Sequence, residues 1–186
     1  DTFLCLNGHT ITGAAGKDTI DVGSGVNFIL TDCKGSGKIT HESSDAVGCG
    51  VKVIGSFTMY GGSITGNHNS DGGGVRVEDT GSFTMYGGSI TGNSVSGSGG
   101  GVWVSAQGGT QQGRFAMYGG SITGNNASSF GSGGVCVYGT MTVSGSVRIT
   151  DNVNRGSKGD NGIYTGGTAS NVRLVGRTTI TIDGPL

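Results

Sequence analysis

Residues 59–67, Met-Tyr-Gly-Gly-Ser-Ile-Thr-Gly-Asn, return unchanged at residues 85–93 and again at residues 117–125 of this 186-residue chain. Repeats at intervals of roughly 20 to 50 residues are typical of solenoids, in which each unit buries its apolar face against its neighbours. The repetition therefore predicts a stacked architecture and makes the repeat the natural frame for every other residue.

Weaker copies of the unit extend along the rest of the chain. They are Leu4–Gly13, Phe28–Thr40, Met141–Asn152 and Val172–Thr181. An apolar triplet with an outward central residue precedes most units, at Ile20–Val22, Val51–Val53, Val75–Val77, Val102–Val104 and Val135–Val137, with Ile163–Thr165 as a degraded sixth copy. The segment Leu4–Gly13 matches Phe57–Gly66 position for position in apolar character.

Each unit holds three short segments in which apolar and polar residues alternate, separated by Gly-rich corners. Alternation with a period of two residues is typical of strands with one buried face, and no helical pattern accompanies it. The pattern predicts an all-β parallel β-helix with three short strands per coil and about six to seven coils. We expect residues 1–186 to form a single domain that belongs to a longer protein.

Composition narrows the class of partner. Gly accounts for 42 residues and Pro for 1, which excludes collagen and Pro-rich disorder. A net charge of −1 gives no reason to expect nucleic acid or an anionic membrane as a partner. The sequence shows no signal peptide and no apolar stretch long enough for a membrane helix, so we expect no direct membrane insertion.

The outward residues of the first strand share no chemistry. This column should contain Asp21, Lys52, Arg76, Trp103, Cys136 and Tyr164. Because a ligand-binding column should repeat one chemistry, we interpret this face as solvated. The alternative is a cation–π contact of Lys52 or Arg76 with Trp103.

The second strand should bury a Phe and a Met in every middle coil and leave a column of tyrosines outside. Tyr60, Tyr86 and Tyr118 would then stack on one another. Such a column is either a platform for a sugar ring or a purely stabilising aromatic ladder.

The third strand should bury an Ile and expose a Thr in every coil. The hydroxyl columns resemble the Thr-x-Thr arrays of ice-binding solenoids, although Lys38 and Arg148 interrupt them. The Asn that follows this strand in four copies, beginning at Asn67, predicts a structural ladder that satisfies corner amides.

Loops that depart from the repeat are the other binding candidates, because recognition residues concentrate in loops. The longest runs from Ser105 to Arg114, and a second begins at Asn126. The candidate ligand-binding residues outside the tyrosine column are Trp103, Gln111, Gln112, Arg114 and Phe130.

The sequence gives no active site. Glycoside hydrolysis needs two carboxylates at a matched separation, and the acids do not recur at one offset in consecutive coils. Among the polar residues of two neighbouring corners, His41, His68 and Asp71 are weak candidates for a metal, so we expect no metal and no cofactor. The four cysteines lack metal spacing, and a disulfide among Cys5, Cys33 and Cys49 stays open.

Segments 4–11 (Leu-Cys-Leu-Asn-Gly-His-Thr-Ile) and 30–33 (Leu-Thr-Asp-Cys), together with Gly-Gly-Gly-Val and the central repeat, resemble the β-helix repeats of large bacterial surface proteins. The alternation of Gly-Gly-Gly-Val with Ile-Thr-Gly-Asn is similar to repeats of the chlamydial polymorphic outer-membrane adhesins, without their Phe before the Asn. The resemblance covers essentially the whole chain. It implies a right-handed, pectin-lyase-like β-helix, a secreted or cell-surface location, and no catalytic residues.

We therefore expect a non-catalytic surface module of the adhesin or stalk type, whose partners would be glycans or surface proteins. The alternatives are a carbohydrate-active β-helix, such as a polysaccharide lyase or hydrolase, and an ice-binding solenoid.

Overall fold

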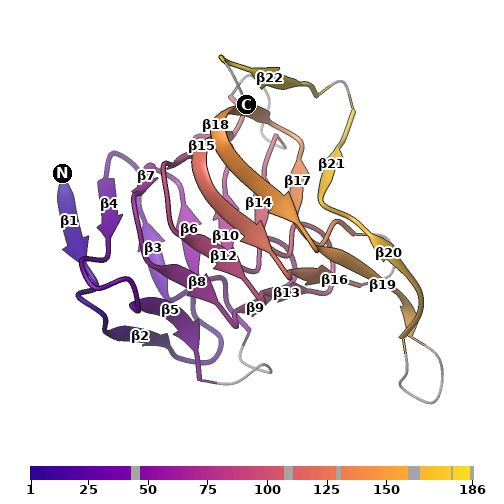
Figure 1. The fold of residues 1–186 in the computed structure, drawn as a ribbon, viewed down its shortest axis with the longest axis horizontal. Helices are drawn as coiled ribbons and strands as arrows, with labels where there is room; N and C mark the ends of the chain where they lie inside the picture. Colours follow the sequence, from indigo (N-terminus) through magenta and orange to yellow (C-terminus); the bar gives the residue numbers. More distant parts are fainter. Residues whose placement is uncertain (43–46, 107–110, 129–130, 159–163, 177, 185–186) are drawn as a thin grey trace.

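The computed structural model describes residues 1–42, 47–106, 111–128, 131–158, 164–176 and 178–184. The chain winds into a parallel β-solenoid of about five turns, and the described residues form strands but no helix (Figure 1). Successive turns lie side by side, so each strand pairs with its counterpart in the next turn. The predicted all-β parallel solenoid is confirmed.

The strands form three sheets, here called A, B and C. Sheet A follows the order β1-β4-β7-β11-β15-β12-β8-β5-β2, with β18 paired to β15 and β22 to β18. Its strands are β1 (Thr2–Cys5), β2 (Thr10–Gly13), β4 (Asn27–Thr31), β5 (Lys38–His41), β7 (Ser56–Met59), β8 (Ser63–Thr65), β11 (Ser82–Met85), β12 (Ser89–Thr91), β15 (Arg114–Thr123), β18 (Thr140–Thr150) and β22 (Ile180–Ile182).

Sheets B and C complete the solenoid. Sheet B has the order β21-β17-β14-β10-β6-β3, and sheet C has the order β20-β19-β16-β13-β9. Sheet B consists of β3 (Ile20–Val22), β6 (Val51–Val53), β10 (Val75–Val77), β14 (Val102–Val104), β17 (Val135–Val137) and β21 (Val172–Leu174). Sheet C consists of β9 (His68–Asn69), β13 (Ser94–Val95), β16 (Asn126–Ala127), β19 (Val153–Lys158) and β20 (Tyr164–Ala169).

The coil from β6 to β9 shows how the repeat produces the winding. In β7, Phe57 and Met59 are buried and the alternating residues Ser56 and Thr58 are half-buried, as alternation requires. The corner before β8 contains Gly62 at φ +85°, a left-handed conformation that favours glycine. The same corner recurs with Gly88 and Gly120 at the same φ, so the second Gly of each repeat is where the chain turns.

The structure does not confirm the prediction of three strands per coil and six to seven coils. Each middle turn contains a further strand of two residues directly after the Asn that ends the repeat. These short strands belong to sheet C. Conversely, β15 and β18 each run through the corner that separates two strands in earlier turns. Counting periodic segments in the sequence missed both features, because two residues are too few to show alternation.

Two repeat assignments near the C-terminal end were wrong. The supposed sixth triplet lies in β20, which pairs antiparallel with β19 instead of joining sheet B; its first residue, Ile163, lies outside the described residues. The true continuation of sheet B is β21, since Val172 pairs with Val135. Ile180 pairs with Met141, and therefore belongs to the second-strand column.

At the other end, the alignment of the first copy was also wrong by two residues. Leu4 pairs with Leu30, which pairs in turn with Met59, so Leu4 does not occupy the column of Phe57. The third-strand alignment is correct, because Ile11 pairs with Ile39 and Ile39 with Ile64. The two extra residues lie in the corner, where Leu6 is buried.

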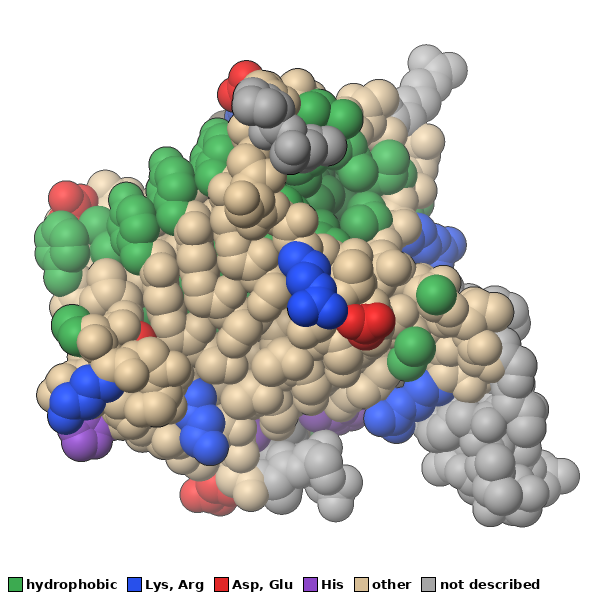
Figure 2. Space-filling view, viewed as in Figure 1, with side chains coloured by type: hydrophobic (Ala, Val, Ile, Leu, Met, Phe, Trp, Pro, Cys, Tyr) green, Lys and Arg blue, Asp and Glu red, His purple; other side chains and the backbone are tan. Residues whose placement is uncertain are grey.

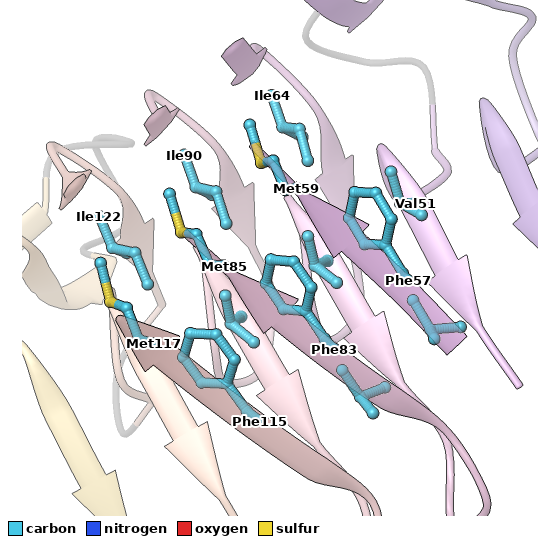
Figure 3. Packing of buried hydrophobic residues seen from close by; sticks show 14 of the residues in the cluster. Val51, Phe57, Met59, Ile64, Phe83, Met85, Ile90, Phe115, Met117 and Ile122 are labelled. Carbon is cyan, nitrogen blue, oxygen red and sulfur yellow. The ribbon is translucent and has the colours of Figure 1, made fainter. Parts of the chain in front are cut away.

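The core consists of columns of identical side chains that run from coil to coil (Figure 3). Phe57 and Phe83 stack with ring centroids 4.9 Å apart, and Phe83 and Phe115 with centroids 5.0 Å apart. Parallel columns of Met and Ile lie beside them in Figure 3, and all of these middle-coil side chains are buried. Because identical side chains contact one another in neighbouring coils, each coil fits the next in only one register.

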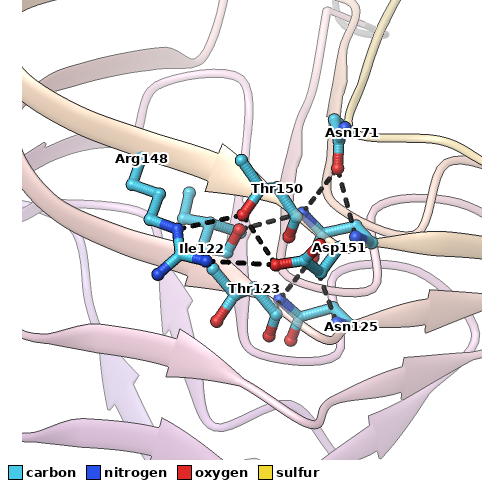
Figure 4. Close-up of polar contacts among 8 residues, drawn as sticks. Ile122, Thr123, Asn125, Arg148, Thr150, Asp151 and Asn171 are labelled. Carbon is cyan, nitrogen blue, oxygen red and sulfur yellow. Dashed lines mark hydrogen bonds and ion pairs between the residues drawn. The ribbon is translucent and has the colours of Figure 1, made fainter.

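A column of asparagines runs alongside this core. Asn125 Nδ2 donates to Asn152 Oδ1 at 2.9 Å and to the Ile90 carbonyl oxygen at 2.9 Å, and the Asn125 backbone N–H donates to Asn152 Oδ1 at 3.0 Å. The members are Asn67, Asn93, Asn125, Asn152 and Asn171, and we call them the Asn ladder. Figure 4 shows the end of the ladder that contains Asn125 and Asn171. The predicted structural role is confirmed, with Asn171 as a member that sequence analysis missed.

Candidate functional site

The tyrosine column predicted outside sheet A is present. Tyr60 and Tyr86 stack with ring centroids 5.0 Å apart, and Tyr86 and Tyr118 with centroids 5.2 Å apart. Tyr60 and Tyr86 are 54% and 48% exposed. Figure 2 shows a row of hydrophobic side chains along the margin that contains β1, β4 and β7 in Figure 1.

The orientation of the rings limits what this column can bind. The Tyr60 and Tyr86 planes differ by 8°, and the Tyr86 and Tyr118 planes by 20°, so the rings cover one another's faces. A sugar stacks on the face of an aromatic ring, and Tyr86 has a neighbour on both faces. Only the outer faces of the two end rings remain for stacking. The geometry therefore favours the stabilising interpretation of this column over that of a continuous sugar platform.

Trp103 occupies the expected outward position in β14, but its side chain is buried and not solvated. Its side chain is only 4% exposed, and the adjacent Cys136 is fully buried, so the outer column of sheet B is not uniformly solvated. The Arg76 guanidinium lies 5.3 Å from the Trp103 ring centroid, so Arg76 makes the cation–π contact that had been the alternative to a solvated face. The same guanidinium pairs with Glu78 at 3.0 Å. The Tyr138 ring packs against Trp103, with the ring centroids 5.8 Å apart. Trp103 therefore supports its neighbours and does not itself face solvent.

The candidate ligand-binding residues in the loops differ in exposure and in whether the structure describes them. Gln111 and Gln112 are exposed, and Arg114 is exposed at the start of β15. Phe130 lies outside the described residues. Of these candidates, Gln112 lines a surface groove that the sequence analysis did not anticipate.

This groove lies over the corner between sheets B and A in the later coils, and we call it the corner groove. It has a volume of about 420 Å³. Its lining residues are Ala106, Gln112, Tyr138, Gly139, Thr140, Val175, Gly176, Thr178, Thr179 and Thr181. The floor is the tight corner 138–139 between β17 and β18, whereas the equivalent corners of the flanking coils are longer, at 105–113 and 175–179. A short corner between two longer ones was the sequence signal for this groove.

The three weak metal candidates have structural contacts. His41 is buried at the end of the Asn ladder, where its Nδ1 lies 2.8 Å from Asn67 Oδ1 and its Nε2 lies 2.8 Å from the Lys17 carbonyl oxygen. His68 Nδ1 lies 2.8 Å from the Ser94 hydroxyl. Asp71 accepts a hydrogen bond from the Ser98 backbone N–H at 2.8 Å. Within the described ranges, no three His, Cys, Asp or Glu side chains are grouped so that they could hold a metal ion.

Several carboxylates instead support corners. Asp32 accepts backbone N–H bonds from Gly8 at 2.7 Å and from Gly37 at 2.6 Å. Desolvation alone would raise the pKa of Asp32, but these bonds and others to backbone amides outweigh it and lower the pKa below its usual 3.8. Asp18 similarly accepts a bond from the Cys49 backbone N–H at 2.9 Å. Such carboxylates are already engaged as acceptors and do not form an acid–base pair.

The cysteines also have structural environments. Cys5 and Cys33 form a disulfide, which settles the pairing left open by the sequence. Burial raises the pKa of the Cys49 thiol well above its usual value, and the neighbouring Asp18 carboxylate raises it further. Burial likewise raises the pKa of the Cys136 thiol. Neither free thiol is therefore activated as a nucleophile.

Searches against protein-family models, curated proteins and solved structures found no match to this chain. Among the described residues, no helix has the length and apolar character needed to cross a bilayer. The case for a function therefore rests on the geometry of the fold and its surfaces.

Proposed function

We propose that this chain is a non-catalytic β-helical module of a secreted or cell-surface protein, of the adhesin or stalk type. The observation that carries the proposal is the set of uninterrupted ladders. Phe, Met, Ile and Asn columns repeat through the middle coils, so the chain is rigid along the direction in which its turns stack. A rod of this kind spaces other groups or presents a face to a partner.

The proposal includes a right-handed winding of the pectin-lyase type, and glycans or surface proteins as partners. A small net charge of −1 supports a partner other than nucleic acid. The disulfide between Cys5 and Cys33 supports an oxidising, extracytoplasmic location, because such bonds persist mainly there.

This function is favoured over a polysaccharide lyase or hydrolase by what the carboxylates do. Asp18, Asp32 and Asp71 each accept hydrogen bonds from backbone amides of a neighbouring coil or corner. A hydrolase needs two carboxyl groups facing one substrate across roughly 5 to 10 Å. Corner carboxylates that hold the backbone are better suited to stability than to proton transfer.

The test is surface location together with binding. Antibodies against residues 1–186 should label intact source cells, and mild external proteolysis should remove the label. The purified chain should also bind to intact cells or to members of a glycan array. If the protein occurs only in the cytosolic fraction, or if the chain binds neither cells nor glycans nor surface proteins and has no effect on cell attachment when deleted, the proposal is wrong.

Ice binding is the second candidate, and the register of sheet A favours it. Thr65, Thr91, Thr123 and Thr150 pair in consecutive strands, and Ser63, Ser89 and Ser121 form the neighbouring column. Hydroxyls in parallel strands repeat at about 4.8 Å across the sheet, which gives a regular grid. A thermal-hysteresis measurement tests this candidate: Thr91→Tyr should abolish the activity and the exposed Thr168→Tyr should preserve it. Absence of hysteresis in the unmodified chain would exclude ice binding.

A further inference from the structure

The corner groove combines an aromatic side chain with polar groups that no internal contact uses. The side chains of Gln112, Thr140, Thr179 and Thr181 have no hydrogen-bond partner among the described residues, and all four are exposed. Thr178 differs, since its hydroxyl lies 3.2 Å from the Tyr138 carbonyl oxygen and 2.7 Å from that of Val175. Thr178 thus holds the wall of the groove to its neighbours, whereas the other lining threonine hydroxyls are available for hydrogen bonds.

Tyr138 supplies the apolar component of the groove. Its ring packs against buried Trp103 at 5.8 Å with the planes inclined by 55°, so this neighbour does not cover a Tyr138 face as the members of the tyrosine column cover each other. Arg76 in turn packs on Trp103 at 5.3 Å, so the support extends into the neighbouring coils of sheet B. Because Trp103 supports the Tyr138 ring, the ring is a preorganised surface on which the C–H face of a sugar can stack.

The lack of charged side chains among the lining residues indicates the class of ligand that would fit the groove. None of the ten lining residues is ionisable at neutral pH. Among the residues that the structure describes, the charged side chain nearest in register is Arg114, which pairs with Thr140 across β15 and β18 but is not part of the lining. Arg177 lies outside the described residues. Hydroxyl and amide groups beside one aromatic ring complement a neutral molecule rich in hydroxyls. The volume of about 420 Å³ falls within the roughly 300 to 1,000 Å³ of small-molecule sites.

From these contacts we propose that the corner groove binds a neutral oligosaccharide, with Tyr138 beneath a sugar ring and Gln112, Thr140 and Thr179 hydrogen-bonded to its hydroxyls. The inference rests on the proposed function, and it names both the ligand class and the face that an adhesive module would use. It also moves the binding surface away from the tyrosine column, whose middle ring has no free face.

Titration of the full chain with cello-, manno- and xylohexaose tests the proposal, with hexagalacturonate as the acidic comparison. Binding of at least one neutral hexasaccharide should shift the backbone amide resonances of Gly139, Thr140 and Gly176. Thr140→Val and Thr179→Val retain side-chain shape and remove one hydroxyl, so each should weaken binding by about two- to tenfold. Thr12→Val, an exposed threonine of the first coil, is the matched control and should bind normally.

Several results would overturn the proposal. It fails if no neutral hexasaccharide shifts these resonances at millimolar concentration, or if the Thr140→Val/Thr179→Val double variant binds like the unmodified chain. Preference for hexagalacturonate that disappears in Arg114→Gln would replace the neutral ligand with an acidic one. Glycan or cell binding that is lost only in Tyr60→Ser would leave the adhesive function intact and refute the groove. Circular dichroism of each variant excludes unfolding as the cause.

Discussion

The middle coils and the last coil obey the same pairing rules but differ in how completely their cores close. Between β11 and β15, Phe83 meets Phe115 and Met85 meets Met117, and all four are buried. Between β15 and β18, Met117 instead meets Val143, which is half-buried. An apolar hollow of about 350 Å³ opens there, lined by Met141, Val143, Gly145, Ser146, Val147, Ile149, Val172 and Ile180. Backbone register is therefore not sufficient for closure; the core also needs large side chains that match.

The largest predicted effect is in the Phe column. Phe83→Ala should lower the free energy of unfolding by about 3–5 kcal/mol, because it removes a fully buried ring from between two others. Val143→Ala should cost on the order of 1–2 kcal/mol, since Val143 is already partly exposed. Urea denaturation of both variants measures the difference. A loss for Val143→Ala as large as that for Phe83→Ala would contradict the partial burial of Val143.

The Asn ladder offers the next comparison. Asn93→Ala leaves the Asn67 backbone N–H and side-chain amide without their acceptor, Asn93 Oδ1, in a buried site. We expect a loss of about 2–3 kcal/mol in the free energy of unfolding. Asn171→Ala should cost less, because Asn171 is only half-buried and water can replace its oxygen. Urea midpoints and amide hydrogen exchange at Asn67 check both statements; unchanged exchange at Asn67 would contradict the assigned role.

A smaller effect is expected in the tyrosine column. Tyr86→Leu removes two stacking contacts and Tyr118→Leu removes one that the structure describes. Aromatic pairs contribute about 0.5–1.5 kcal/mol each beyond the burial of area. The Tyr86 variant should therefore have the lower thermal midpoint of the two in calorimetry. If the Tyr118 variant had the lower thermal midpoint, Tyr118 would make a further contact that stabilises the fold more than the second stacking contact of Tyr86.

The smallest effect at neutral pH is expected at Asp32, in the first coils. Because its folded pKa is lowered, the charged carboxylate stabilises the fold above the unfolded value near 3.8, and this contribution is lost as the pH falls through the folded pKa. Asp32→Asn should thus be less stable than the unmodified chain at pH 7 and equally stable at strongly acidic pH. A difference in unfolding midpoint that persists at pH 2 would contradict the mechanism.

Sequence reasoning was most successful where the repeat is exact. The inward Phe, Met and Ile columns, the outward tyrosines and the Asn ladder all follow from alternation and a constant offset. It failed where alternation was too short or too degraded to carry a signal. The two residues of β9 show no period, and Val172–Leu174 satisfies the patterns of two different strands equally well.

The functional residues were harder to predict for a physical reason. Trp103 has an outward position in its strand, and alternation alone cannot show that neighbouring Arg76 and Tyr138 side chains pack against it. The corner groove depends on the relative lengths of three corners in different coils, and this three-dimensional relation appears only after the coils are correctly aligned. The wrong alignment of the final copy concealed its Thr178 and Thr179 wall.

The Asn ladder gives the solenoid a polarity with a genetic consequence. Each Asn side chain donates to the Oδ1 of the following Asn, and its own Oδ1 accepts from the preceding Asn, so the Asn–Asn bonds of every middle coil run in the same direction. A DNA duplication that copies one whole coil would therefore insert a unit whose two faces already match its new neighbours. The number of coils could therefore change by duplication of a whole coil without redesign of the core.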